Sequence, residues 1–247
     1  MLELHDVSKR FGGISAVEGL SFDIREHTIT ALIGPNGSGK TVTFNLITGL
    51  SRLDQGQIRF QGERVDGLSP DRIALLGIAR TFQHLKIFPE FTVTENLGFL
   101  QQPRHLLSSL ASLRPGRPRH PESPDVQDLL EFVGLWGKRH ERAGSLSYGQ
   151  QKLLALIGLL TMNPRPSLIL LDEPMAGINP TLITTLVTLI RTSRARGRTF
   201  LIIEHDMAVV MDLCDHLVVL DHGNKIAEGP PQAIRENADV IEAYFGR

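Results

Sequence analysis

Hydrophobic and polar positions follow different patterns in different parts of the chain. Near the start, short apolar runs are separated by turns such as Gly12-Gly13, and these runs predict strands. After Gly149, fully apolar runs alternate with longer helical stretches, as expected for a parallel sheet that is buried on both faces. The predicted strands are residues 2–4, 17–24, 29–33, 57–60, 168–171, 200–203 and 217–220. The pattern therefore predicts an α/β protein.

The middle of the chain has a different character. Residues 94–100 and 125–135 predict helices, whereas residues 103–124 contain five prolines and four arginines. We expect a loop or a solvated linker there. Further helices are predicted at residues 41–50, 150–162, 181–196, 207–213 and 239–245.

Composition limits the classes of function. The chain has 247 residues, of which 41% are hydrophobic and 21% charged, as is usual for a globular protein. Its net charge of −1 gives no overall field that would attract nucleic acid or anionic lipid. The one cysteine, Cys214, cannot form an intrachain disulfide and is expected to be a buried apolar side chain. No apolar stretch reaches the length of a membrane span, and the N-terminus lacks a signal-peptide pattern. If the protein acts at a membrane, we expect it to dock onto another chain.

A phosphate-binding loop lies between the predicted strand 29–33 and the predicted helix 41–50. The pattern G-x-x-x-x-G-K-[ST] is complete in Gly34, Pro35, Asn36, Gly37, Ser38, Gly39, Lys40 and Thr41. Its glycines let backbone N–H groups surround a phosphate, Lys40 supplies a positive charge, and the Thr41 hydroxyl can bind Mg²⁺. The positive end of the helix dipole adds to the attraction. We therefore expect a nucleoside triphosphate site.

A pair of carboxylates follows the apolar run 168–171. Asp172 is placed to hold Mg²⁺ at the carboxyl edge of a parallel sheet, where ligands bind in such folds. Glu173, one residue further on, can polarise an attacking water molecule. An acidic loop or a helix N-cap would be the alternative for an isolated Asp-Glu pair, but the upstream loop favours the nucleotide site.

A third motif, Leu146-Ser147-Tyr148-Gly149-Gln150, resembles the L-S-G-G-Q signature of the ATP-binding cassette (ABC) family. The order of motifs also matches that family, with Gln83 before the signature and His205 after the strand 200–203. The resemblance covers essentially the whole chain. It implies a single nucleotide-binding domain, residues 1–247, with a P-loop NTPase core of residues 1–83 and 151–247. That core would hold a mixed sheet and an N-terminal antiparallel β subdomain, and residues 84–150 would form an α-helical subdomain that carries the signature.

The resemblance also implies roles for individual residues. ATP and Mg²⁺ would be the cofactors, with Glu173 as catalytic base, His205 as the switch histidine and Gln83 as the lid glutamine. Mg²⁺ would be held by Thr41, Gln83 and Asp172. Phe11 would stack on adenine, although core packing is an alternative for this side chain. The remaining nucleotide contacts would come from residues 34–41, from Thr43 and, on the ATP of the opposite subunit, from Ser147, Gly149 and Gln150.

Two departures from the family pattern indicate a subgroup. Tyr148 replaces the usual first glycine of the signature, and Ala176-Gly177-Ile178-Asn179 stands where S-A-L-D is common. Both departures, the tract Arg80-Thr81-Phe82-Gln83-His84 and the end of the chain resemble ATPases of importers for branched-chain amino acids or related amides and urea.

The resemblance implies an ATPase subunit of an importer, without a membrane span of its own. Two identical or different ATPase chains would enclose two ATP molecules, and membrane permease subunits would dock at residues 84–150, where Phe88, Phe91 and Phe99 are candidates for contact. A separate substrate-binding protein is expected, and nucleic acid is not. The chain would lie at the cytoplasmic face of the inner or plasma membrane. The alternatives are the ATPase of a lipopolysaccharide-export system and a non-transport cassette ATPase that acts on nucleic acid.

Overall fold

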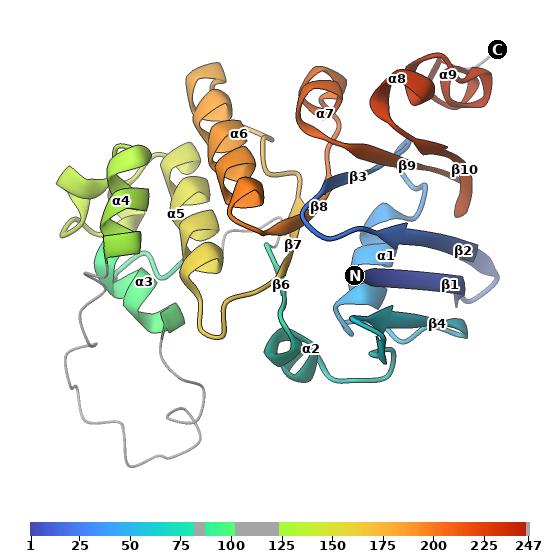
Figure 1. Ribbon diagram of the computed structural model, residues 1–247, viewed down its shortest axis with the longest axis horizontal. Coiled ribbons are helices and arrows are strands. Elements are labelled where there is room, and N and C mark those ends of the chain that lie inside the picture. Colours follow the sequence, from blue (N-terminus) through green and yellow to red (C-terminus); the bar gives the residue numbers. More distant parts are fainter. Residues whose placement is uncertain (82–86, 102–123, 246–247) are drawn as a thin grey trace. The chain divides into compact units, whose positions relative to one another are not determined.

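The computed structural model describes residues 1–81, 87–101 and 124–245 (Figure 1). Contacts between Cα atoms divide the chain into two compact units. Unit 1 comprises Met1–Arg80, Ser167–Pro174 and Arg191–Arg247, and unit 2 comprises Thr81–Pro166 and Met175–Ile190. The sequence motifs predicted a division at residues 83 and 150, and these boundaries differ from those of the two units. The predicted division stays a prediction.

Unit 1 is built on two sheets. Within the described residues, one sheet has six strands in the order β10-β9-β3-β8-β7-β6, and the other has four in the order β2-β1-β4-β5. The strands of the larger sheet are β3 (Ile29–Ile33), β6 (Ile78–Arg80), β7 (Leu168–Asp172), β8 (Thr199–Ile203), β9 (His216–Asp221) and β10 (Asn224–Gly229). All its pairs are parallel except β9 with β10, so the sheet is mixed, as predicted.

The smaller sheet is antiparallel throughout its described pairs. Its strands are β1 (Leu2–Phe11), β2 (Ile14–Ile24), β4 (Gln55–Phe60) and β5 (Glu63–Arg64). This confirms the predicted N-terminal β subdomain, and β1 and β2 are longer than the sequence indicated. The pairing of β1 with β2 shifts register between Leu4 and Val7, where Asp6 has a φ of 48°. A β-bulge breaks the alternation of apolar and polar residues there, so the sequence pattern does not predict the second half of β1.

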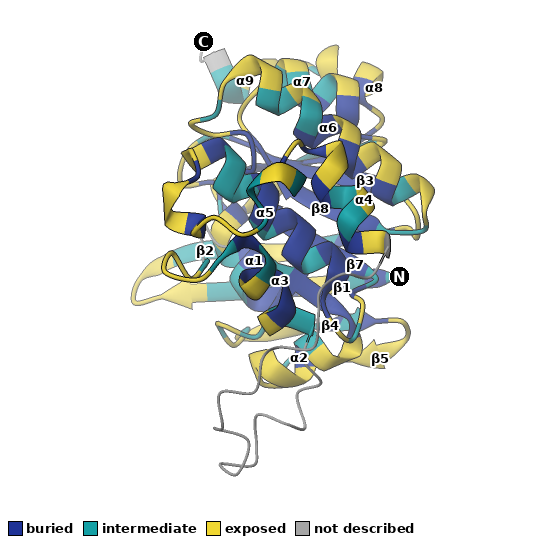
Figure 2. Ribbon diagram, turned by 90° about the vertical axis from the view of Figure 1, so that its left-hand side faces the viewer, coloured by how far each residue is buried: buried dark blue, intermediate teal, exposed yellow. Residues whose placement is uncertain are grey.

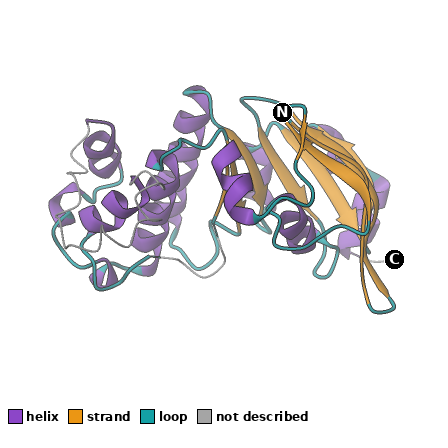
Figure 3. Cartoon of the chain, turned by 90° about the horizontal axis from the view of Figure 1, so that it is seen from below, coloured by secondary structure: helices purple, strands orange, loops and turns teal. Residues whose placement is uncertain are grey.

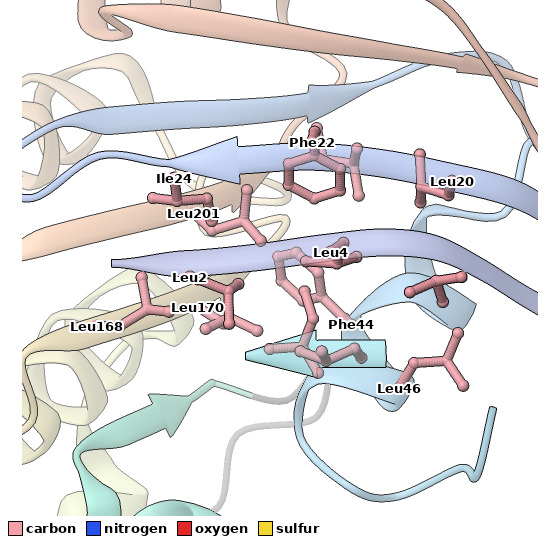
Figure 4. Close-up of a cluster of buried hydrophobic side chains, with 14 of the residues drawn as sticks. Leu2, Leu4, Leu20, Phe22, Ile24, Phe44, Leu46, Leu168, Leu170 and Leu201 are labelled. Carbon is pink, nitrogen blue, oxygen red and sulfur yellow. The ribbon is translucent and has the colours of Figure 1, made fainter. Parts of the chain in front are cut away.

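The main core of unit 1 joins the two sheets through helix α1 (Lys40–Ile47). Figure 4 shows side chains from β1 and β2 lying opposite Leu168, Leu170 and Leu201 of the larger sheet, with Phe44 of α1 beside them. Only alternate residues of β7 enter this cluster, because side chains of a strand point to opposite faces. Ile169 and Leu171, on the other face of β7, are also buried. The larger sheet is thus buried on both faces, which explains its fully apolar runs.

The remaining helices of unit 1 flank the sheets (Figure 3). They are α2 (Pro70–Leu76), α7 (Met207–Leu213), α8 (Pro231–Arg235) and α9 (Ala238–Phe245), and the last residues of α6 (Pro180–Ala195) also belong to this unit. Asp206 caps the start of α7 by accepting hydrogen bonds from the N–H groups of Ala208 (3.0 Å) and Val209 (3.2 Å). The helices α2 and α8 and the strands β5, β6 and β10 were not predicted.

Unit 2 is helical in its described residues, as predicted for the part that carries the signature. It contains α3 (Val93–Gln101), α4 (Pro124–Phe132), α5 (Tyr148–Thr161), the first residues of α6, and short 3₁₀ helices at Trp136–Lys138 and Ala143–Ser145. Helices α3 and α4 both pack on α5, whose inward face is dark blue in Figure 2. None of the helices in the described ranges combines the length and the hydropathy that a bilayer crossing requires.

Candidate functional site

The phosphate-binding loop connects β3 to α1 in unit 1, and two of its glycines are sterically required. Gly34 has a φ of 148°, and a Cβ atom there would lie 2.0 Å from the carbonyl oxygen of Leu220. Gly39 has a φ of 103°, and its Cβ would lie 2.5 Å from the carbonyl oxygen of Ala16. Gly37 also has a positive φ, 81°, but open space surrounds it. The loop is therefore tightly held at both ends and open in the middle.

Lys40 lies in the first turn of α1 and points back into the loop. Its Nζ atom donates hydrogen bonds to the carbonyl oxygens of Gly34 (2.8 Å) and Pro35 (2.7 Å) and to the hydroxyl of Ser38 (3.3 Å). Burial lowers the pKa of Lys40, and the nearby charges of Glu173 and Asp172 oppose this shift. A compact cation thus lies within the loop, close to the predicted catalytic base Glu173 and the predicted Mg²⁺ ligand Asp172.

Asp172, the last residue of β7, is held by an arginine that the sequence did not indicate. Arg80 ends β6, the neighbouring strand, and its guanidinium lies 2.7 Å from Oδ2 of Asp172. Both side chains are almost completely buried. Arg80 also donates to Oδ1 of Asn45 (2.7 Å) and stacks over the ring of Phe44, 5.2 Å from its centroid. The carboxylate is therefore fixed by α1 and β6 as well as by its own strand.

Glu173 and His205 meet at the carboxyl ends of β7 and β8. Nε2 of His205 lies 3.0 Å from Oε1 of Glu173, and both side chains are partly exposed. Glu173 has a φ of 48°, which is unfavourable for a residue with a side chain, and its N–H donates to the carbonyl oxygen of Ile203 (2.9 Å). The buried Glu204 accepts a hydrogen bond from the His205 N–H (2.8 Å). A partly exposed carboxylate next to an imidazole can accept a proton from water.

Phe11 lies at the tip of the β1–β2 hairpin, where it pairs with Ile14. Its side chain is 52% exposed, so it is not a core residue, and Lys9 lies over its ring at 5.3 Å. The following residues of β2 approach the phosphate-binding loop, because Ala16 limits the space at Gly39. An exposed ring on a hairpin that adjoins this loop is available for stacking on a base.

A hollow of about 570 Å³ adjoins the loop within unit 1. Pro35, Asn36 and Ser38 line it together with residues of β9, β10 and α9. Tyr244 of α9 is half-buried, and its hydroxyl accepts a hydrogen bond from the backbone N–H of Gly34. Burial raises the pKa of Tyr244, and this hydrogen bond opposes the shift. No pattern in the sequence indicated that the last helix contacts the first glycine of the loop.

The signature residues belong to unit 2. Ser147 caps α5: its hydroxyl accepts a hydrogen bond from the Gln150 N–H (3.3 Å), and Oε1 of Gln150 accepts one from the Ser147 N–H (3.1 Å). Gly149 is buried, and a Cβ atom there would lie 2.5 Å from Cδ1 of Leu182. The motif is thus a rigid helix start with exposed Ser147 and Tyr148.

Three exposed phenylalanines form an aromatic cluster on unit 2. The ring of Phe88 lies 5.2 Å from that of Phe91 and 4.9 Å from that of Phe99, between centroids. Asn96 holds this segment by accepting from the Phe88 N–H (2.8 Å) and donating to the Thr92 carbonyl (2.9 Å). The sequence left core packing open for these rings, and exposures of 37–43% show that all three reach the surface.

The structure brings together part of the predicted site. Lys40, Thr41, Asp172, Glu173 and His205 share unit 1, whereas Ser147, Gly149 and Gln150 lie in unit 2. The predicted role of Gln83 cannot be compared with the structure, because this residue lies outside the described ranges.

Thr43, which was also predicted to contact nucleotide, is fully buried. Its hydroxyl donates to the Gly39 carbonyl (3.0 Å), so it braces the loop from within. Its predicted contact with nucleotide stays a prediction.

The oxygen atoms near the loop fit Mg²⁺ better than a metal held entirely by protein. Thr41 is exposed in the first turn of α1, and Asp172 ends the buried strand β7. Among the described residues no cluster of three or more His, Cys, Asp or Glu side chains could hold a metal. Mg²⁺ commonly binds one or two protein oxygens, with phosphates and water completing its shell.

Comparison with known proteins agrees with this geometry. Residues 17–176 match the family profile described as ABC transporter, and residues 224–247 match one described as Branched-chain amino acid ATP-binding cassette transporter. The high-affinity branched-chain amino acid transport ATP-binding protein BraF of Pseudomonas aeruginosa is 41% identical, over 100% of this chain and 98% of its own. LivG of Escherichia coli K12, described in the same words, is 38% identical over the same shares.

The fold is also similar to solved cassettes. The ADP conformation of MJ1267, an ATP-binding cassette of an ABC transporter, has a TM-score of 0.83 and 33% identity, over 100% of this chain and 99% of that one. A more distant cassette, MJ0796, has a TM-score of 0.75 at 22% identity, over 94% and 99%, and shows likeness of fold alone. The P-loop, the mixed sheet and these full-length relatives together show that the chain is an ATP-binding, ATP-hydrolysing subunit of the ABC transporter family.

Proposed function

We propose that this chain hydrolyses ATP to drive the import of branched-chain amino acids or closely related small amides. The observation that carries the catalytic half of the proposal is the arrangement of unit 1. The P-loop follows β3. At the ends of β7 and β8 lie the carboxylates of Asp172 and Glu173 and the imidazole of His205. The substrate half rests on the printed names of relatives that match the full length of the chain.

Glu173 is the proposed catalytic base. Its Oε1 atom lies next to Nε2 of His205, so the imidazole orients the carboxylate and can contact the terminal phosphate. A carboxylate at this position removes a proton from the attacking water, and such a base commonly accelerates a reaction by about 10²- to 10⁴-fold. Lys40 neutralises phosphate charge, and backbone N–H groups of residues 34–41 surround the phosphates.

Thr41 and Asp172 would hold Mg²⁺, with Gln83 as a further predicted ligand. When bound, this ion neutralises charge on the β- and γ-phosphates. The buried guanidinium of Arg80 holds the Asp172 carboxylate at the end of β7. Its positive charge already compensates part of the negative charge of this carboxylate, so Asp172 needs less positive charge from Mg²⁺. Phe11 supplies an exposed ring for the adenine.

The signature at the start of α5 points to a shared site. Ser147, Gly149 and Gln150 would contact the ATP of a second ATPase chain, which is identical to this one or a relative of it. Hydrolysis would then separate the two chains and move permease subunits by favouring one of their two states. The exposed cluster of Phe88, Phe91 and Phe99 offers these subunits an apolar surface, and the chain would reach the cytoplasmic face of the membrane through them. A separate binding protein would deliver the substrate.

Uptake by cells tests the proposal. Deleting the gene should abolish high-affinity uptake of radiolabelled leucine, isoleucine and valine, while lysine uptake serves as the control. Wild-type protein should restore uptake, and Lys40→Ala protein, made at the same level, should not. Normal leucine uptake in the deletion strain would refute the proposed substrate. An export defect in lipopolysaccharide instead would favour the alternative assignment.

A further inference from the structure

Tyr148, which departs from the common signature, contacts the second departure from the family pattern. A Cβ atom built on Gly177 would lie 3.3 Å from Cε1 and 3.7 Å from Cδ1 of the Tyr148 ring. The ring therefore lies directly over the backbone of Gly177. Gly177 has a φ of 73°, so a side chain at this position would be disfavoured by the backbone as well as by the ring. Both residues belong to unit 2.

Lys152, one turn further along α5, contacts both Tyr148 and the residue that precedes Gly177. Its Nζ atom donates a hydrogen bond to the Ala176 carbonyl oxygen (2.7 Å) and lies over the Tyr148 ring, 5.3 Å from its centroid. The ammonium group is thus bonded to the segment 176–179 and attracted to the face of the aromatic ring. Tyr148, Lys152 and Gly177 form what we call the aromatic clamp.

The clamped segment continues into α6 (Pro180–Ala195). The Ile178 N–H makes a long hydrogen bond to the Met175 carbonyl oxygen (3.4 Å). Asn179 caps α6, because its Oδ1 atom accepts a hydrogen bond from the Leu182 N–H (2.9 Å). Ile178 also packs close to Gly149 of the signature. The side chains of Tyr148, Lys152 and Ile178 therefore connect the segment that follows the Glu173-Pro174 pair to the start of α5.

We propose that Tyr148 is a positioning residue, which holds residues 176–179 against the signature so that both move as one element. A glycine at position 148, as in the common signature, would lack the ring that fixes Gly177, and a bulkier residue at 177 would displace the ring. The two departures from the family pattern are thus one structural adaptation. The functional part of this inference rests on the proposed function, in which the signature contacts the ATP of a second chain.

Amide hydrogen exchange tests the positioning directly and without ATP. Tyr148→Gly should speed exchange of the Ile178 N–H by about tenfold or more, since loss of the clamp frees a weakly bonded segment. Tyr148→Phe keeps the ring and should exchange as wild type does. Phe132→Gly is the matched control, because it removes an equally exposed aromatic ring (47%) from α4 of the same unit. Unchanged exchange at Ile178 in Tyr148→Gly would overturn the inference.

A double-mutant cycle tests the contact itself. Gly177→Ala adds backbone strain and a contact with the ring, and the strain is the same whether or not the ring is present. In ATPase assays, Tyr148→Gly and Gly177→Ala should each lower kcat while changing the KM for ATP by less than about twofold, because the P-loop is unaltered. The double variant should lose at least about threefold less activity than the product of the single losses. Strict multiplication of the two losses would contradict direct contact.

The two tests separate the inference from the proposed function. If the wild-type chain shows no ATPase activity under any condition, the proposed function fails, and the exchange result still decides whether Tyr148 positions residues 176–179. If ATPase activity is present but exchange at Ile178 is the same in all variants, the positioning inference fails alone.

Discussion

The buried pair of Arg80 and Asp172 gives a quantitative prediction for stability. Their 2.7 Å contact is shielded from water, since the side chains are 6% and 2% exposed. Replacing Arg80 by Met keeps most of the volume but leaves a buried carboxylate without its guanidinium. Breaking a buried pair in this way costs about 3–5 kcal/mol, a large share of the roughly 5–15 kcal/mol that holds a typical protein folded.

The partner substitution separates charge from packing. In Arg80→Met/Asp172→Asn both charges are absent, so the free energy of unfolding should lie well above that of Arg80→Met alone. Arg64→Met is the matched control: Arg64 forms a pair of similar length with Asp66 (2.8 Å) but is 58% exposed. Its removal should cost no more than about 1 kcal/mol.

Urea unfolding followed by far-ultraviolet circular dichroism measures these three variants and the single variant Asp172→Asn against wild type. The reasoning requires Arg80→Met to be the least stable and the double variant to recover part of the loss. An Arg80→Met protein within about 1 kcal/mol of wild type would refute it. A double variant that shows the full sum of both single losses would also refute it, because the two charges would then not interact.

Three further predictions concern the loop and the thiol. Tyr244→Phe removes a hydroxyl that accepts from Gly34 and should raise the KM for ATP about three- to tenfold with little change in kcat, whereas Ile241→Ala, exposed on the same helix, should not. Gly34→Ala should abolish ATP binding in calorimetry and destabilise more than Gly37→Ala, because only the former Cβ meets a backbone carbonyl. Burial raises the pKa of Cys214 from 9.0 to about 12, so the native thiol should alkylate far more slowly at pH 9 than in urea. Because the unfolded thiol ionises first, stability should fall more steeply above pH 9 in wild type than in Cys214→Ala.

The sequence predicted those elements whose physical cause is local. Fully apolar runs mark β7 and β8 because the sheet is covered on both faces, and the loop of residues 34–41 is recognisable because its glycines adopt backbone conformations that other residues disfavour. The strand β10 was missed since it lies at the edge of the sheet, and its residues Asn224, Lys225 and Glu228 are polar and exposed. The strand β6 has only three residues, too few to show any period.

Contacts between distant parts of the chain could not be predicted in this way. Arg80 and Asp172 lie 92 positions apart and meet only because β6 pairs with β7. Tyr244 reaches Gly34 from the last helix, and nothing in the pattern of either segment indicates the other. The contact between Tyr148 and Gly177 could have been suspected from one signal, since both residues depart from the common family pattern.

The most direct test of the account compares wild type with Glu173→Gln in two assays, ATP turnover and ATP-dependent dimerisation by light scattering. Oε1 of Glu173 lies 3.0 Å from Nε2 of His205 at the end of the sheet. Since a glutamine side chain has the same shape and keeps this oxygen, we expect the amide variant to bind ATP normally. Its turnover should fall by about 10²-fold or more, and ATP should trap it as a dimer. Wild-type turnover in Glu173→Gln, or ATP binding without hydrolysis in the wild type, would contradict the assignment of Glu173 as the catalytic base.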